Sequence, residues 1–81
     1  QAYYLTGVLY KENGRYNLAL MFLQKARRLN RADLQTEIAL ARIYQKLGQT
    51  PQAVQIYRHV LKGDSLNPKA LNSLAAIYFK Q

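Results

Sequence analysis

Apolar residues recur along the whole chain at intervals of three and four, which is the spacing of residues on one face of an α-helix. Strand-like alternation of apolar and polar residues does not compete with this pattern. Turn-forming residues interrupt the pattern and divide the chain. The sequence therefore predicts five helices, at about residues 1–13, 15–29, 34–47, 51–62 and 68–80.

The predicted helix ends carry recognisable stop and start signals. Gly14 and Gly48 follow the first and third helices, and glycine readily adopts the left-handed conformation that ends a helix. Polar residues precede the later helices, two of them directly before a proline. The predicted N-terminal caps are Asp33, with Glu37 in the first turn, Thr50 before Pro51, and Asn67 before Pro68.

The chain repeats itself with a period of 34 residues, which separates Tyr10 from Tyr44 and Tyr44 from Tyr78. A small residue lies three positions before each tyrosine, and Ala19 matches Ala53 at the same offset. Small residues on one helix face allow a second helix to approach closely. We expect Ala41 and Ala53 at such a crossing, and the tyrosine rings between consecutive helix pairs. The small residues before the tyrosines are Gly7, Ala41 and Ala75.

These residues resemble the tetratricopeptide repeat, a helix–turn–helix unit of 34 residues. The first copy reads Gly7-x-x-Tyr10…Gly14…Ala19…Leu23…Ala26, the second Leu40-Ala41-x-x-Tyr44…Gly48…Ala53…Tyr57…Val60, and the third Leu74-Ala75-x-x-Tyr78. The resemblance implies an all-α, right-handed α-solenoid of antiparallel helix pairs. Residues 1–33 and 34–67 would form two repeats and residues 68–81 the first helix of a third. Because the pattern is already under way at Gln1, we interpret the chain as one domain from a longer solenoid.

The composition argues against a metal site, a disulfide or a catalytic site. The 81 residues include no cysteine and one histidine, so thiolate zinc sites, disulfides and multi-histidine metal sites are excluded. Capping or a helix end explains the placement of the carboxylates, and no two form an acid–base pair. The longest apolar run, residues 18–23, is too short to cross a membrane. We expect no enzyme, cofactor or metal; the residues considered are Glu12, Asp33, Glu37, Asp64 and His59.

The net charge of +8 leaves two interpretations open. Basic residues crowd the ends of the second and fourth helices, where they complement the helix dipole. The alternative interpretation is a secondary basic patch for an acidic partner, although no signature of a nucleic-acid-binding fold supports nucleic acid as that partner. The patch comprises Lys25, Arg28, Arg31, Arg58 and Lys62.

The resemblance implies that first helices line the inner face of the solenoid. That face is apolar near Tyr4 and basic further on, which suits a peptide or protein segment with apolar and acidic residues. Only Lys69 matches the carboxylate clamp of chaperone-binding relatives, so such a clamp is disfavoured. The predicted groove residues are Tyr4, Val8, Lys11, Gln35, Ile38, Arg42, Gln45, Lys46, Lys69, Asn72 and Ala76, with Gln1, Glu12, Phe79 and Lys80 on the same face.

The sequence therefore predicts a non-catalytic protein-interaction scaffold. Two alternatives stay open: a module that binds an acidic polymer, such as anionic polysaccharide or nucleic acid, and a structural spacer in a bacterial envelope assembly or polysaccharide export protein. The last helix predicts self-association as well, because part of its apolar face, including Ile77 and Phe79, should be exposed.

Overall fold

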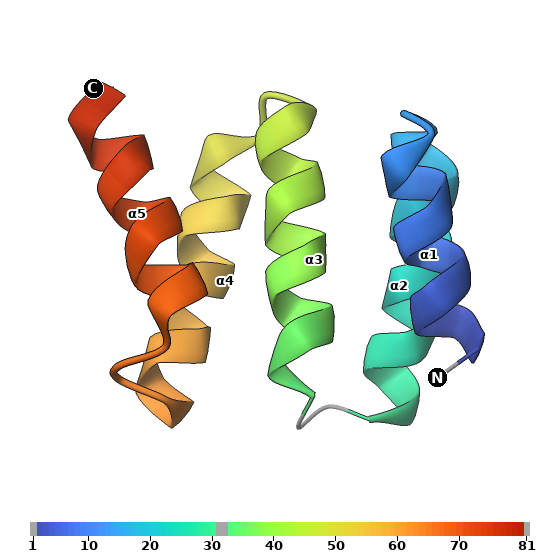
Figure 1. The fold of residues 1–81 in the computed structure, drawn as a ribbon, viewed down its shortest axis with the longest axis horizontal. Coiled ribbons are helices and arrows are strands. Elements are labelled where there is room, and N and C mark those ends of the chain that lie inside the picture. Colours follow the sequence, from blue (N-terminus) through green and yellow to red (C-terminus); the bar gives the residue numbers. More distant parts are fainter. Residues whose placement is uncertain (1, 31–32, 81) are drawn as a thin grey trace.

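The computed structural model describes residues 2–30 and 33–80, so the expectations for Gln1 and Arg31 lie outside the described residues. The described part of the chain is helical and contains no strand. Helices α1, α3 and α5 form one layer, and α2 and α4 lie behind them, as Figure 1 shows. The fold is the predicted all-α repeat solenoid. Its helices are α1 Ala2–Glu12, α2 Tyr16–Leu29, α3 Leu34–Lys46, α4 Thr50–Gly63 and α5 Pro68–Lys80.

The two tight turns within the helix pairs are alike. Gly14 and Gly48 have φ angles of 79° and 80°, in the left-handed region where glycine is favoured. In each turn the next residue's N–H reaches back five residues: Arg15 donates to the Tyr10 carbonyl at 2.9 Å, and Gln49 donates to the Tyr44 carbonyl at 2.8 Å. These bonds satisfy carbonyls at the helix end, so each glycine fixes how the chain reverses.

Two of the three predicted helix caps are confirmed. Asp33 accepts a hydrogen bond from the Gln35 N–H at 3.0 Å, and the Asn67 side chain accepts one from the Ala70 N–H at 3.1 Å. The prediction for Thr50 was wrong. Because the Gly48 turn leads directly into α4, Gln49 is the N-cap and already accepts the first helical bond, from the Ala53 N–H at 3.3 Å.

Helices cross closely at the small residues, as expected. Ala41 and Ala53 are both fully buried. Gly7 is buried against α2, and a Cβ there would lie 2.5 Å from Leu23 Cγ, so a larger residue would push the two helices apart. Ala75 occupies the same register on α5 but is exposed, because no helix covers that side of α5 among the described residues.

The repeated tyrosines lie at the packing contacts. Tyr10 stacks on Phe22 with ring centroids 5.6 Å apart. At the two junctions between helix pairs, equivalent side chains meet: Gln24 donates to the Tyr44 hydroxyl at 3.5 Å and Arg58 to the Tyr78 hydroxyl at 2.9 Å.

The face of α5 that packs on α4 was predicted in part. Phe79 is 91% exposed, as expected, but Ile77 is only 6% exposed, so the prediction of an open Ile77 was wrong. Ala70, Leu74 and Ile77 follow one another at helical spacing, and this stripe is the buried face of the helix. Since α5 contacts α4, the stripe belongs to the core.

The crossing predicts a clear difference between two matched substitutions. Ala41→Leu should lower the free energy of unfolding by about 1–3 kcal/mol, because the added atoms overpack a site with no free surface. Ala75→Leu changes the same register on the exposed face of α5 and should alter stability by less than about 0.5 kcal/mol. Urea denaturation of both variants measures this difference. Equal stability of Ala41→Leu and the unchanged protein would contradict the assigned crossing.

Candidate functional site

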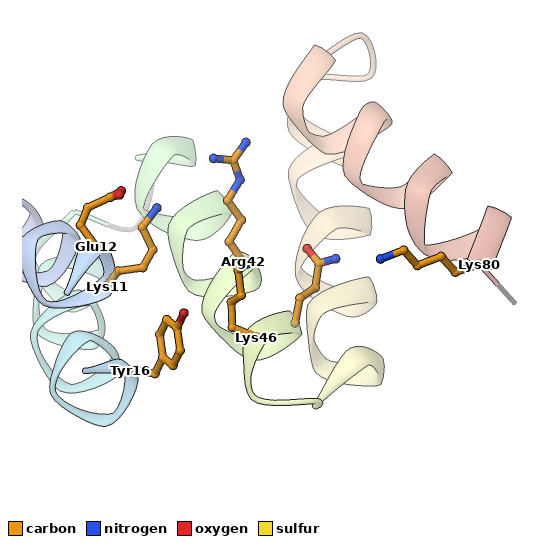
Figure 2. Close-up of a pocket in the computed structure, with 7 residues that line it drawn as sticks. Lys11, Glu12, Tyr16, Arg42, Lys46 and Lys80 are labelled. Carbon is orange, nitrogen blue, oxygen red and sulfur yellow. The ribbon is translucent and has the colours of Figure 1, made fainter. Parts of the chain in front are cut away.

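A hollow with a volume of about 580 Å³ lies among α1, α3 and α5, with the start of α2 at its edge. We call it the basic hollow. Figure 2 shows Lys11 and Glu12 from α1 and Tyr16 from the start of α2 facing α3, with Lys80 of α5 directed toward the same space. Side chains far apart in sequence thus share one site. The lining residues are Lys11, Glu12, Tyr16, Arg42, Gln45, Lys46 and Lys80.

The basic hollow carries excess positive charge. Four of its lining side chains are cationic and one is a carboxylate. Within residues 2–30 and 33–80, none of the four cations forms an ion pair with a carboxylate. Unpaired cations gathered around a recess raise the local concentration of anions. The hollow is therefore suited to a carboxylate or another anionic group.

A buried tyrosine holds one wall of the basic hollow in place. The Tyr57 hydroxyl donates a hydrogen bond of 2.7 Å to Oε1 of Gln45. Burial raises the pKa of Tyr57, while the Ser73 hydroxyl and the Arg42 guanidinium lower it in part. The hydroxyl is thus protonated at neutral pH and available as a donor. Because Oε1 of Gln45 is occupied, the amide group of Gln45 offers N–H donors to the hollow.

A second, smaller recess of about 70 Å³ continues the basic hollow toward the start of α1 and α3. We call it the central hollow, and the two together the groove. They share Lys11 and Arg42. The walls of the central hollow include the half-buried Tyr4 and Val8 and the buried Ile38, which give it an apolar floor beside the cations Lys11, Arg42 and Lys69. Its lining residues are Tyr4, Val8, Lys11, Gln35, Ile38, Ala39, Arg42 and Lys69.

The structure brings most of the predicted groove residues together. Three qualifications apply. Ile38 is only 5% exposed and belongs mainly to the core. Asn72 is exposed on α5 but is not among the residues that line the groove. Ala76 lines a neighbouring recess with Gln45 and Lys80, next to the basic hollow.

The secondary basic patch is not gathered in one recess. Lys25 and Arg28 line a hollow at the end of α2, with Tyr3 and Leu29. Arg58 instead bonds to Tyr78 on α5. Lys62 lies in the last turn of α4, where it complements the helix dipole.

Several residues of the site were not predicted as such. Neither Tyr16 nor Tyr57 was among the predicted groove residues, yet Tyr16 lines the basic hollow and Tyr57 anchors Gln45. A signal was present in the repeat: position 23 holds Leu where its equivalent is Tyr57, and position 50 holds Thr where its equivalent is Tyr16. Tyr57 thus adds a hydroxyl that Leu23 lacks, and Tyr16 adds an aromatic ring that Thr50 lacks, so the two copies differ at these positions.

Within the described residues, no group of three His, Cys, Asp or Glu side chains is placed to hold a metal ion. None of the described helices combines the length and the apolar character needed to cross a membrane. Asp33 is occupied as a helix cap, bonding Gln35 N–H and the Thr36 hydroxyl. Glu37 is buried and pairs with Arg27 at 2.7 Å.

The sequence model of the tetratricopeptide repeat family matches residues 10–77. Human protein O-mannosyl-transferase TMTC1 is 33% identical to the chain over 75 residues. The match covers 93% of this chain and 8% of that protein. The chain thus corresponds in length to a small part of that relative.

Proposed function

Since the chain belongs to the tetratricopeptide repeat family, whose repeats generally mediate interactions between proteins, we propose that it binds an acidic segment of a partner protein in the groove. The carrying observation is the basic hollow, where four cations from three different helices face one recess. Acidic side chains of the segment would occupy this hollow, and apolar side chains would contact Tyr4 and Val8 in the central hollow.

In this proposal the chain itself acts by binding a partner and not by catalysis. Repeats of this family are typically scaffolds, and the carboxylates Asp33 and Glu37 serve a helix cap and an ion pair. TMTC1 is named as an O-mannosyl-transferase, but the similarity covers only 8% of it. The organisation that accompanies this proposal is two complete repeats, residues 1–33 and 34–67, followed by the first helix of a third over residues 68–81.

A labelled peptide tests the proposal. This peptide, which we call the single-cluster peptide, has a run of Asp and Glu at one end, Leu and Phe in the middle, and Gln at the other end. Fluorescence anisotropy should show saturable binding that disappears when the acidic residues are replaced by Gln. Absence of binding to the unchanged protein would overturn the groove proposal and favour a structural spacer.

Salt dependence separates this proposal from the binding of an acidic polymer. Raising salt from about 0.05 to 0.2 M weakens binding to a polyanion by about 10³–10⁵-fold when six to ten charges are contacted. The single-cluster peptide should lose much less affinity, because its apolar contacts do not depend on counterion release. Heparin and a dT oligonucleotide serve as polymer probes. Tighter binding of either probe than of the peptide at the higher salt would favour the polymer.

We also propose that copies of the chain associate end to end. Helices α1 and α5 lie at opposite ends of the row, and both expose apolar side chains. Leu5 and Leu9 of α1 are 59% and 65% exposed, and Tyr78 and Phe79 of α5 are 48% and 91% exposed. A second copy therefore offers a matching apolar surface, and contact between unlike ends leads to open assemblies.

The net charge of +8 opposes this association. Salt screens that repulsion beyond about 10 Å at 0.1 M, so association should increase with salt. Sedimentation at low and high salt measures it, with Phe79→Ser as a variant expected to reduce association. A monomer at high protein concentration under both conditions would contradict the end-to-end contact.

A further inference from the structure

A separate recess of about 250 Å³, which we call the edge hollow, lies where the start of α1 meets the end of α2. It is lined by Tyr3, Lys25, Arg28 and Leu29. Tyr3 is 40% exposed and Leu29 73% exposed, so apolar surface lies beside two cations. The groove does not use any of these four residues.

Aromatic stacking fixes the position of one of these cations. Tyr3 and Tyr10 both stack on Phe22, with ring centroids 6.2 and 5.6 Å apart. Lys25 Nζ lies 5.7 Å from the centre of the Tyr3 ring and 5.6 Å from that of Phe22. This distance is within the range of cation–π attraction, so the ammonium group is held near the rings and close to Arg28.

Scaffold packing does not account for this arrangement. In the second repeat, the positions equivalent to Tyr3, Phe22 and Lys25 hold Glu37, Ile56 and His59. The second repeat folds in the same way without the stacked rings or the cation. Arg27, next in sequence, is engaged by Glu37, whereas neither Lys25 nor Arg28 pairs with a carboxylate among the described residues. Two cations therefore remain available at the edge.

The edge hollow is connected to the groove by shared residues. A small recess of about 50 Å³ lies between them and is lined partly by Tyr4 and Leu29. Tyr4 also lines the central hollow, and Leu29 also lines the edge hollow. A surface path thus runs from Lys80 across the groove, past Tyr4 and Leu29, to Arg28. Cations lie at both of its ends. Its middle combines the apolar side chains of Tyr4, Val8 and Leu29 with polar and charged side chains, among them Asp33 and Thr36.

We propose that the edge hollow is a second anion-binding subsite, and that the partner is an extended segment with two acidic clusters separated by apolar residues. This proposal rests on the proposed function of the groove. One cluster occupies the basic hollow, the apolar stretch contacts Tyr4, and the second cluster reaches Lys25 and Arg28. The longest dimension of the molecule is 32 Å, so an extended segment of about ten residues spans the path.

A double-cluster peptide tests the second subsite. It has the same length and the same apolar centre as the single-cluster peptide. Acidic residues replace the Gln residues, so both of its ends are acidic. Because the second cluster binds within the same complex, the double-cluster peptide should bind at least about tenfold more tightly than the single-cluster peptide. This comparison is made at one salt concentration, by anisotropy, with the unchanged protein.

Charge-reversal variants show which residues cause the tighter binding of the double-cluster peptide. Arg28→Glu should remove most of the tenfold advantage and leave binding of the single-cluster peptide unchanged. Lys62→Glu is the matched control, because Lys62 holds the equivalent position in the second repeat and lies outside the path. Lys62→Glu should preserve the advantage of the double-cluster peptide.

The possible failures are distinct. If the single-cluster peptide does not bind the unchanged protein, the groove function is wrong. If it binds but the second cluster adds no affinity, the groove stands and the edge subsite is wrong. An equal loss from Arg28→Glu and Lys62→Glu would show that the second cluster responds only to net charge, which also overturns the subsite.

Discussion

Replacing Arg27 with Leu should lower the free energy of unfolding by about 1–3 kcal/mol, because it leaves the buried Glu37 carboxylate without its partner. The Arg27 side chain is 45% exposed, so the larger cost of breaking a fully buried ion pair does not apply. Arg27 Nε lies 2.7 Å from Oε2 of Glu37, and the Glu37 side chain is 3% exposed. The other oxygen, Oε1, is buried without a hydrogen-bond partner among the described residues. Without Arg27, the carboxylate would stay buried with no compensating charge.

The repeat itself suggests the compensating change. At the next junction the equivalent positions hold Leu61 and Leu71, so the same architecture accommodates two leucines there. The double variant Arg27→Leu/Glu37→Leu should therefore recover most of the lost stability, to within about 1 kcal/mol of the unchanged protein or above it. We therefore expect the pair at the first junction to contribute no more stability than two leucines would.

Thermal unfolding followed by circular dichroism measures both effects. For a domain of this size, 1 kcal/mol corresponds to about 4–8 °C, so the single variant should melt at least about 4 °C lower. Arg28→Leu is the control, because Arg28 is exposed and should change stability by less than about 0.5 kcal/mol. A double variant as unstable as Arg27→Leu would show that packing of the arginine stem, and not the unpaired charge, causes the loss.

The fold was largely predictable from the sequence because its determinants are local and repeated. Helical spacing, the left-handed Gly14 and Gly48, and the caps at Asp33 and Asn67 each act within a few residues, and the 34-residue period makes them visible twice. The start of α4 was misplaced by one residue, because the cap assigned to Thr50 depends on how the preceding turn ends.

Interactions between repeats were harder to predict. Glu37 was interpreted as an acidic residue in the first turn of its helix, a position that favours negative charge. Its actual partner, Arg27, lies on the other side of a loop, and the pairing depends on how α2 and α3 cross. The sequence does hold a trace of this ion pair. At the junction between the second and third repeats, leucines stand at both equivalent positions, so the two residues differ together between the repeats.

The groove was predictable to the extent that it follows helix faces. Lys11 and Arg42 were placed on the inner face by helical spacing together with the resemblance to the repeat family, and both line the two parts of the groove. The contribution of Tyr57 could not be foreseen in this way. Its ring lies in the core, and only the crossing of α3 and α4 brings its hydroxyl to Gln45.

Arg42→Glu should weaken binding of the single-cluster peptide at least about 30-fold, corresponding to the 2 kcal/mol or more lost when a charge at the centre of an interface is removed. Arg42 lines both the basic and the central hollow, so in the proposed complex it would contact the segment where its acidic and apolar parts meet. The substitution also places a second carboxylate beside Glu12, which repels the ligand.

The fold should tolerate this change, because the Arg42 side chain is exposed and pairs with no carboxylate among the described residues. Circular dichroism checks that point. Arg28→Glu makes the same change of charge at the edge hollow and should leave binding of the single-cluster peptide within about twofold, since salt screens a charge outside the contact. If Arg28→Glu were the damaging variant and Arg42→Glu were harmless, a single acidic cluster would bind at the edge of α2, and the groove would not be the binding site.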